Sequence, residues 1–203
     1  MKRQFRRAVA IAKLQPMTRH ERDQRPYTAL FCEENVWQLA REMVSSGNDM
    51  CRSEVLFFVN AADSVVMLNQ RAADPGMAIG WDYHVVLRVH NPHDLVFDAD
   101  TRLPYPCATR EYLLHSFPRQ SALPAHFQAW VRRVPVTTFL SRFDSDRSHM
   151  RGRVPAAAFP PWPTIRATDT QHAISLRHYC DVTARLDDGS RVLPLDEFLQ
   201  LTG

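Results

Sequence analysis

Apolar positions recur along this chain with two different periods, which predict helices in some segments and strands in others. Residues 33–46 place Val36, Ala40 and Met43 at helical spacing, and Gly47 supplies a stop, so we expect an amphipathic helix there. Short apolar runs rich in β-branched and aromatic residues predict strands instead. These runs lie at residues 56–59, 65–68, 83–90 and 95–98.

A turn sequence joins the last two of these strands. The segment Asn91-Pro92-His93-Asp94 separates them and predicts an antiparallel hairpin. Further helices are expected at residues 109–116, 124–132 and 195–201, and a proline-rich irregular loop at 152–164. Helices on both sides of a run of strands predict an α+β fold, an antiparallel sheet packed with helices.

Length and charge divide the chain into two parts. The 203 residues suffice for one domain, and no apolar run approaches the roughly 20 residues of a membrane span. The first 25 residues hold eight basic and two acidic side chains, a net charge of +6 against +3 for the whole chain. We therefore expect a flexible basic extension at residues 1–26 and a single catalytic domain at residues 27–203. With few aromatic residues, the extension makes a poor nucleic-acid arm.

The cysteines indicate a reducing compartment rather than a metal or disulfide framework. Cys32, Cys51, Cys107 and Cys180 form no C-x-x-C pair, and no H-E-x-x-H motif is present. We therefore expect no metal and no other cofactor.

Cys32 is the candidate nucleophile, because it stands where a turn meets the predicted helix. The positive end of the helix dipole favours the thiolate form there. His84, near the start of a strand, and Asp98, at the end of its hairpin partner, can supply a base and a carboxylate that orients it. The sequence does not fix the hairpin register, so Asp100 competes with Asp98. His149 is the rival base.

Five blocks of the sequence resemble the signature blocks of the protein N-terminal glutamine amidohydrolase family, in the same order. They are residues 32–37, 81–87, 97–101, 103–106 and 145–150, and the resemblance runs from about Tyr27 to about residue 165. The family has a Cys-His-Asp triad, which falls by motif position on Cys32, His84 and Asp98. Its fold resembles the papain and transglutaminase class of cysteine enzymes.

The resemblance implies hydrolytic deamidation of an N-terminal glutamine to glutamate, with release of ammonia through a thioester intermediate. It implies protein or peptide substrates. From the composition and the cysteines we also expect no nucleic acid and no membrane partner, and a monomer in the cytoplasm. In eukaryotic members the product feeds an N-degron route. The arginine-rich composition suggests a GC-rich, bacterial genome, in which case delivery to a host cytosol is the alternative location.

Selectivity for a chain terminus requires a pocket that accepts the α-ammonium group. Four acids inside the signature blocks are candidates: Glu33, Glu34, Asp82 and Asp146. Trp81 and Tyr83 are candidates for its walls. The alternative for Glu33 and Glu34 is structural, because acids in the first turn of a helix favour its dipole. Large aromatic residues, likewise, are commonly part of the core.

Three other functions share these sequence features. A transglutaminase-like deamidase would use the same triad on internal glutamines. A cysteine peptidase would use it to cleave peptide bonds. A non-catalytic module that binds N-termini would keep an acidic pocket, but the presence of Cys32, His84 and Asp98 argues against it.

Overall fold

The structure, a computed structural model, describes residues 25–90 and 93–202. The helices are α2 (Cys32–Ser45), α3 (Thr109–Ser116), α4 (Val136–Arg142), α5 (Leu176–Cys180) and α6 (Leu195–Gln200). The strands are β1 (Glu54–Val59), β2 (Val65–Met67), β3 (Ile79–Trp81), β4 (His84–Val89), β5 (Leu95–Phe97), β6 (Cys107–Ala108), β7 (Trp130–Pro135), β8 (Phe143–Asp144), β9 (Ile174–Ser175) and β10 (Arg191–Pro194).

One six-stranded antiparallel sheet organises the domain, in the order β10-β7-β1-β4-β5-β6. Strand β1 is central and pairs with β4 on one side and β7 on the other. The small sheets β2-β3 and β8-β9 lie apart from it. The α+β class and the β4-β5 hairpin predicted from the sequence are both confirmed.

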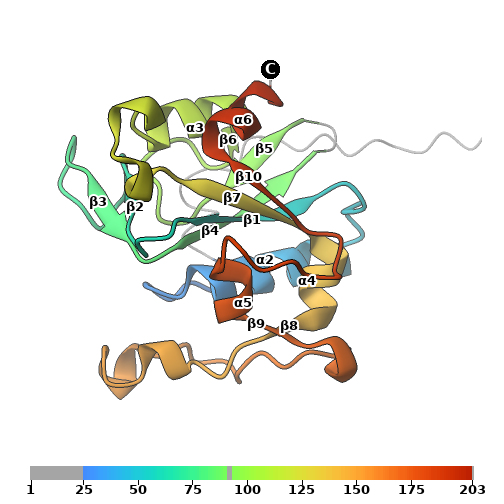
Figure 1. Cartoon of the computed structure of the whole chain (residues 1–203). Coiled ribbons are helices and arrows are strands. Elements are labelled where there is room, and N and C mark those ends of the chain that lie inside the picture. The colour runs from blue at the N-terminus through green and yellow to red at the C-terminus, as the bar shows by residue number, and fades with distance from the viewer. Residues whose placement is uncertain (1–24, 91–92, 203) are drawn as a thin grey trace, which may run out of the picture.

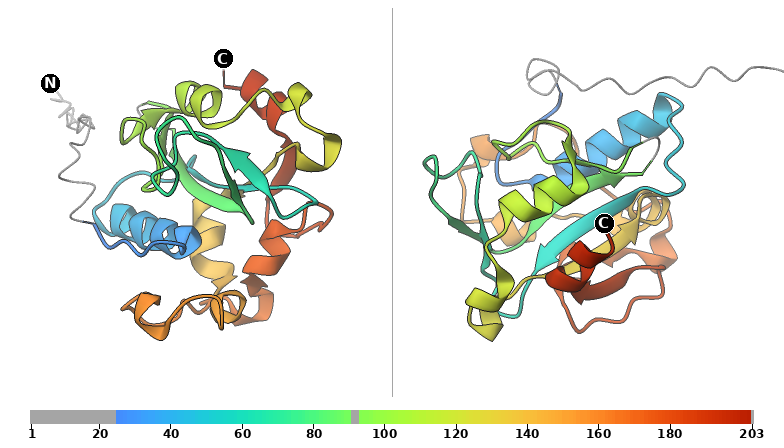
Figure 2. Two further views of the ribbon diagram at one scale, coloured as in Figure 1. Left: turned by 90° about the vertical axis from the view of Figure 1, so that its left-hand side faces the viewer. Right: turned by 90° about the horizontal axis from the view of Figure 1, so that it is seen from above.

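Helices cover both faces of this sheet, as Figures 1 and 2 show from three directions. Helices α2, α4 and α5 lie on one face, and α3 and α6 lie on the other. The side chains of β1 alternate between the two cores: Val55, Phe57 and Val59 face α2, whereas Leu56 and Phe58 face α3. After Glu54, every residue of β1 is apolar and buried, which is why this strand was recognisable as a continuous apolar run.

One helix predicted from the sequence is wrong, and most of the predicted basic extension lies outside the described residues. Residues 124–132, predicted as a helix, form a short 3-10 turn followed by the start of β7. Pairing with β1 along Trp130–Pro135 decides the conformation of that segment, since cross-strand packing overrides a weak local preference. The predicted basic extension lies outside the described residues up to residue 24.

Two further observations complete the description of the fold. The segment that follows β8 runs beneath α2 on the side away from the sheet (Figures 1 and 2). Within residues 25–90 and 93–202, no helix has the combination of length and apolarity that crossing a bilayer requires.

Candidate active site

Cys32 is the first residue of α2, in the position that the sequence predicted. The chain enters the helix through Leu30, whose φ of 69° is left-handed and costs backbone strain. The side chain of Asn35 holds this entry in place: it accepts a hydrogen bond from the Thr28 N–H and donates one to the Thr28 carbonyl, at 2.9 and 2.8 Å. The position of Cys32 is therefore fixed by its own helix and by the segment before it.

His84 and Asp98 meet at the end of the hairpin. The imidazole Nε2 of His84 lies 3.1 Å from Asp98 Oδ2, and both side chains are 2% exposed. Three groups donate hydrogen bonds to Asp98: Tyr112 Oη at 2.8 Å, Gln70 Nε2 at 3.2 Å and the Asp100 backbone N–H at 2.9 Å. The geometry therefore favours Asp98 over Asp100 as the carboxylate that orients His84.

Burial and charge act in opposite directions on this pair. Burial alone lowers the pKa of His84, but the charge and hydrogen bonding of Asp98 outweigh it, and the pKa is raised above its usual value. Burial raises the pKa of Asp98, whereas the charge of His84 and the hydrogen bonds it accepts lower it, so the pKa ends below the usual value. Asp98 is thus ionised at neutral pH and stabilises the imidazolium form of His84.

The thiol of Cys32 departs from the expectation of a thiolate at a helix start. Burial raises its pKa well above the usual value, and the charges of Glu33 and Asp100 raise it further. A hydrogen bond from the Val85 backbone opposes these effects without overcoming them. Desolvation of a charge outweighs a partial helix dipole, so Cys32 rests as a neutral thiol that needs a base.

A cavity of about 250 Å³ opens in front of Cys32. Its lining includes three predicted pocket residues together with both candidate bases: Trp81, Asp82, Tyr83, His84 and His149. Trp81 stacks on the His84 ring, with centroids 6.1 Å apart and planes 18° from parallel. The sequence blocks that hold these residues lie far apart in the chain, and the fold brings them to one wall.

Glu33 lies buried next to this cavity, in a cluster with Tyr83 and His149. Tyr83 donates a hydrogen bond to Glu33 Oε2 at 3.0 Å, and His149 Nε2 lies 3.2 Å from the Tyr83 oxygen and 3.6 Å from Glu33 Oε1. Burial raises the pKa of Glu33 to about 7, and it lowers the pKa of His149. His149 thus has Tyr83 and Glu33 as neighbours, while His84 is the histidine held by Asp98.

Glu34, the adjacent acid, is committed to an internal network. Its two oxygens accept hydrogen bonds from Arg147 at 2.8 and 2.7 Å, from Trp162 Nε1 at 2.7 Å and from Ser145 Oγ at 3.1 Å. The side chain is fully buried and is absent from the lining of the cavity. Glu34 therefore fastens the segment after β8 to the start of α2.

The two exposed candidates differ in their relation to the cavity. Asp82 lines it and pairs with Arg153 at 2.6 Å. Asp146 lies outside the lining, where it accepts a hydrogen bond from the Ser148 backbone at 2.8 Å. Of the four predicted acids, Asp82 alone lines the cavity, and Glu33 lies behind the lining residues Tyr83 and His149.

Sequence reasoning missed the residues that hold Asp98. Gln70 lies in the loop after β2, and Tyr112 lies on α3, 28 and 14 residues away from Asp98 in the chain. An isolated bridge between Gln70 and Thr101 brings the loop to the hairpin end. No local pattern marks these residues, because each reaches Asp98 only through the tertiary fold.

The described residues contain one group of side chains with a spacing suited to a metal ion. A ring nitrogen of His84 and one oxygen each of Asp98 and Asp100 lie within 4.8 Å of one another. Both oxygens of Asp98 already accept hydrogen bonds from protein donors, including Gln70 and Tyr112. A cation would have to displace those donors, so the arrangement suits a histidine held by a carboxylate better than a metal centre.

The raised pKa of Glu33 predicts how stability varies with pH. In the folded protein this pKa is about 7, against an ordinary 4.5, so between those values the folded state holds a proton that the unfolded chain has lost. The free energy of unfolding that Glu33 contributes therefore falls as pH rises through this window, by on the order of 3 kcal/mol. A Glu33→Gln variant lacks this titration. Its melting temperature relative to wild type should rise between about pH 5 and pH 8.

Thermal denaturation followed by circular dichroism measures this difference. Glu197→Gln, at an exposed position in the first turn of α6, is the matched control and should follow wild type at every pH. Parallel curves for Glu33→Gln and wild type would show that Glu33 does not titrate in this window.

Comparison with known proteins gives one consistent result. A family model described as N-terminal glutamine amidase matches residues 27–202. Proteins named protein N-terminal glutamine amidohydrolase from Drosophila melanogaster and Drosophila erecta are each 32% identical over 181 residues, covering 86% of both chains. The protein of that name from Drosophila mojavensis is 31% identical over the same length.

Proposed function

The chain belongs to the N-terminal glutamine amidase family, and from this membership we propose that it hydrolyses the side-chain amide of an N-terminal glutamine in a protein or peptide. The products are N-terminal glutamate and ammonia. The observation that carries the proposal is the cavity that Cys32 shares with His84, whose ring is held by Asp98. A thiol, an imidazole and a buried carboxylate are the groups that acyl transfer through a cysteine requires.

In the first half of the reaction, Cys32 attacks the carboxamide carbon. Because the thiol rests neutral, His84 takes its proton as the carbon–sulfur bond forms. The oxyanion of the tetrahedral intermediate is stabilised by backbone N–H groups at the start of α2, which have no acceptor within the helix. The imidazolium of His84 then protonates the departing nitrogen, and ammonia leaves a thioester on Cys32.

In the second half, water hydrolyses the thioester. His84 accepts a proton from the water, whose oxygen attacks the acyl carbon, and the breaking carbon–sulfur bond returns the electron pair to Cys32. The thiol regains its proton, and the substrate leaves as a carboxylic acid. Asp98 stays ionised throughout, because it keeps the His84 ring oriented and stabilises its charged form.

Recognition of the terminus falls to the wall formed by Glu33, Tyr83 and His149. The α-ammonium of the substrate is a cation with several N–H donors, and this wall offers a phenolic oxygen with a buried carboxylate directly behind it. Asp82 supplies a second negative charge at the rim of the cavity. Trp81 covers the His84 ring and shields it from solvent.

A panel of peptides tests the function. A peptide that begins with glutamine should release ammonia and gain the mass difference between OH and NH2. The N-acetylated peptide should react at least ~100-fold more slowly in kcat/KM, because the site's acceptors are left without the ammonium. The readouts are coupled ammonia detection and peptide mass spectrometry, with an asparagine-initiated peptide and an internal glutamine in a folded protein as comparisons.

Each alternative outcome identifies a different function. Equal turnover of free and acetylated peptides would remove the amine-binding wall from the proposal. Turnover of the internal glutamine would indicate a transglutaminase-like deamidase, and cleaved peptide bonds would indicate a peptidase. Binding of the peptide with no ammonia release would indicate a non-catalytic module.

A further inference from the structure

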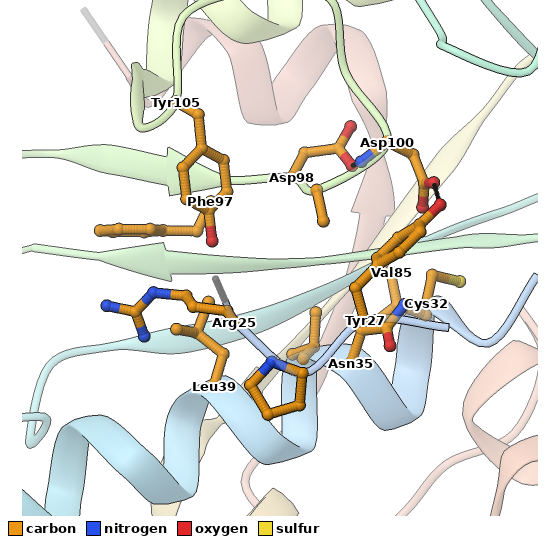
Figure 3. A pocket seen from close by; sticks show the side chains of 13 residues that line it. Arg25, Tyr27, Cys32, Asn35, Leu39, Val85, Phe97, Asp98, Asp100 and Tyr105 are labelled. Carbon is orange, nitrogen blue, oxygen red and sulfur yellow. Dashed lines mark hydrogen bonds between the residues drawn. The ribbon is translucent and has the colours of Figure 1, made fainter. Parts of the chain in front are cut away.

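Asp100 lies at the boundary between two cavities of the site, and the reaction described above gives it no role. A second, smaller cavity of about 30 Å³ lies behind Cys32, between α2 and the hairpin (Figure 3). Asp100 and Cys32 are the two residues common to the linings of both cavities. Asp100 therefore lies, together with Cys32, at the boundary between the two cavities.

Three contacts hold Asp100 in place. The Tyr27 hydroxyl donates a hydrogen bond to Oδ1, and Figure 3 shows the tyrosine ring reaching across from the chain segment before α2. The backbone N–H of Asp100 donates to Asp98, and its carbonyl accepts the Arg71 N–H at 2.7 Å. One carboxylate oxygen lies within 4.8 Å of a His84 ring nitrogen. The backbone of Asp100 is thus fixed on both sides and its side chain is held by Tyr27, near the group that would protonate the leaving nitrogen.

The two neighbouring aspartates have opposite electrostatic settings. Asp98 has His84 and three hydrogen-bond donors, and its pKa is lowered. Burial and the charge of Asp98 raise the pKa of Asp100, which outweighs the influence of His84 and Tyr27. Environments that shift the pKa values of two carboxylates in opposite directions indicate different roles for them. Asp98 holds the base, whereas Asp100 lines the open cavity, where a further N–H donor would favour its charged form.

We propose that Asp100 is a specificity-determining residue that accepts a hydrogen bond from the carboxamide NH2 of the substrate and disfavours the carboxylate of the product. This inference rests on the proposed function. The attacked carbon lies at Cys32 and the leaving nitrogen faces His84, so an oxygen beside His84 meets the hydrogens of that nitrogen. After deamidation the same position faces a carboxylate, and like charges in contact are repelled. Asp100 thus favours binding of glutamine and release of glutamate.

The test compares substrate use with product inhibition. Kinetics on a glutamine-initiated peptide give kcat and KM, and inhibition by the same peptide with N-terminal glutamate gives Ki. In Asp100→Asn the ratio of Ki to KM should fall by about 10-fold or more, because the repulsion is removed, and kcat should fall by roughly 10- to 100-fold. Asp74→Asn, at an exposed turn position, should leave kcat and the ratio unchanged.

A second variant predicts a shift in the pH dependence of this ratio. Tyr27→Phe removes a hydrogen bond that stabilises the charged form of Asp100 and lowers its pKa, on a side chain that is 41% exposed. As pH falls and Asp100 takes up a proton, the ratio of Ki to KM should fall, and in Tyr27→Phe this fall should occur at a higher pH than in wild type. This variant keeps the proposal testable even where Asp100→Asn does not fold.

The outcomes separate the two proposals. If wild type is active and Asp100→Asn loses rate while the ratio of Ki to KM is unchanged, Asp100 is only a positioning residue. That result would overturn the inference. A pH profile of the ratio that is the same in Tyr27→Phe and wild type would also overturn it. A wild-type protein that releases no ammonia from any glutamine-initiated peptide would overturn both the function and the inference.

Discussion

Replacement of Cys32 by alanine should reduce ammonia release from a glutamine-initiated peptide by at least about 10⁴-fold, because in the proposed mechanism the Cys32 sulfur forms the thioester. The partly buried side chain contributes only a sulfur atom to the packing of α2 against the sheet. The melting temperature should therefore stay close to that of wild type. Coupled ammonia detection measures the first quantity, and thermal denaturation measures the second.

The matched control is Cys51→Ala, which removes an exposed thiol between α2 and β1. It should retain the wild-type rate. Because His84 must draw the proton from a neutral thiol, Cys32→Ser should be almost as inactive as Cys32→Ala, since a serine hydroxyl is harder still to deprotonate. A folded Cys32→Ala protein with the wild-type rate would show that the nucleophile lies elsewhere.

The elements that the sequence predicted well are those whose local pattern and tertiary role agree. Helix α2 has an amphipathic repeat with a clear stop, and the β4-β5 hairpin has two apolar runs around a turn sequence. Strand β7 escaped prediction because its conformation depends on β1, about 75 residues earlier in the chain. Its buried Arg132 is held by the carbonyls of Tyr179, Asp181 and Ala184, partners that no local pattern announces.

The same distinction between local pattern and tertiary contact applies to the residues of the candidate site. Cys32, His84 and Asp98 could be selected from the order of their sequence blocks. The separate settings of Glu33 and Glu34 could not, because successive residues on a helix point about 100° apart and meet different parts of the fold. Glu33 meets Tyr83 at the cavity, whereas Glu34 meets groups more than a hundred residues away. Two adjacent residues with identical chemistry therefore make different contacts, which the sequence alone does not distinguish.

Replacement of Arg147 by alanine should destabilise the fold by about 3–5 kcal/mol, because it leaves the buried charge of Glu34 without its main partner. For a domain of this size the melting temperature should fall by roughly 6–20 °C. The Trp162 and Ser145 hydrogen bonds remain but supply no positive charge. Arg151→Ala, at an exposed position in the same segment, is the matched control and should lower the melting temperature by only a few degrees at most.

A double-mutant cycle separates the ion pair from other effects of the substitution. Glu34→Gln in the Arg147→Ala background neutralises the stranded charge, so the double variant should be more stable than the sum of the two single losses predicts. Additive losses would show that Arg147 acts through packing instead.

Because His149 lies two residues beyond Arg147, the single variant should also raise KM for glutamine-initiated peptides as the Tyr83–His149–Glu33 wall loosens. The internal network of Glu34 thus supports the wall to which its neighbour Glu33 belongs.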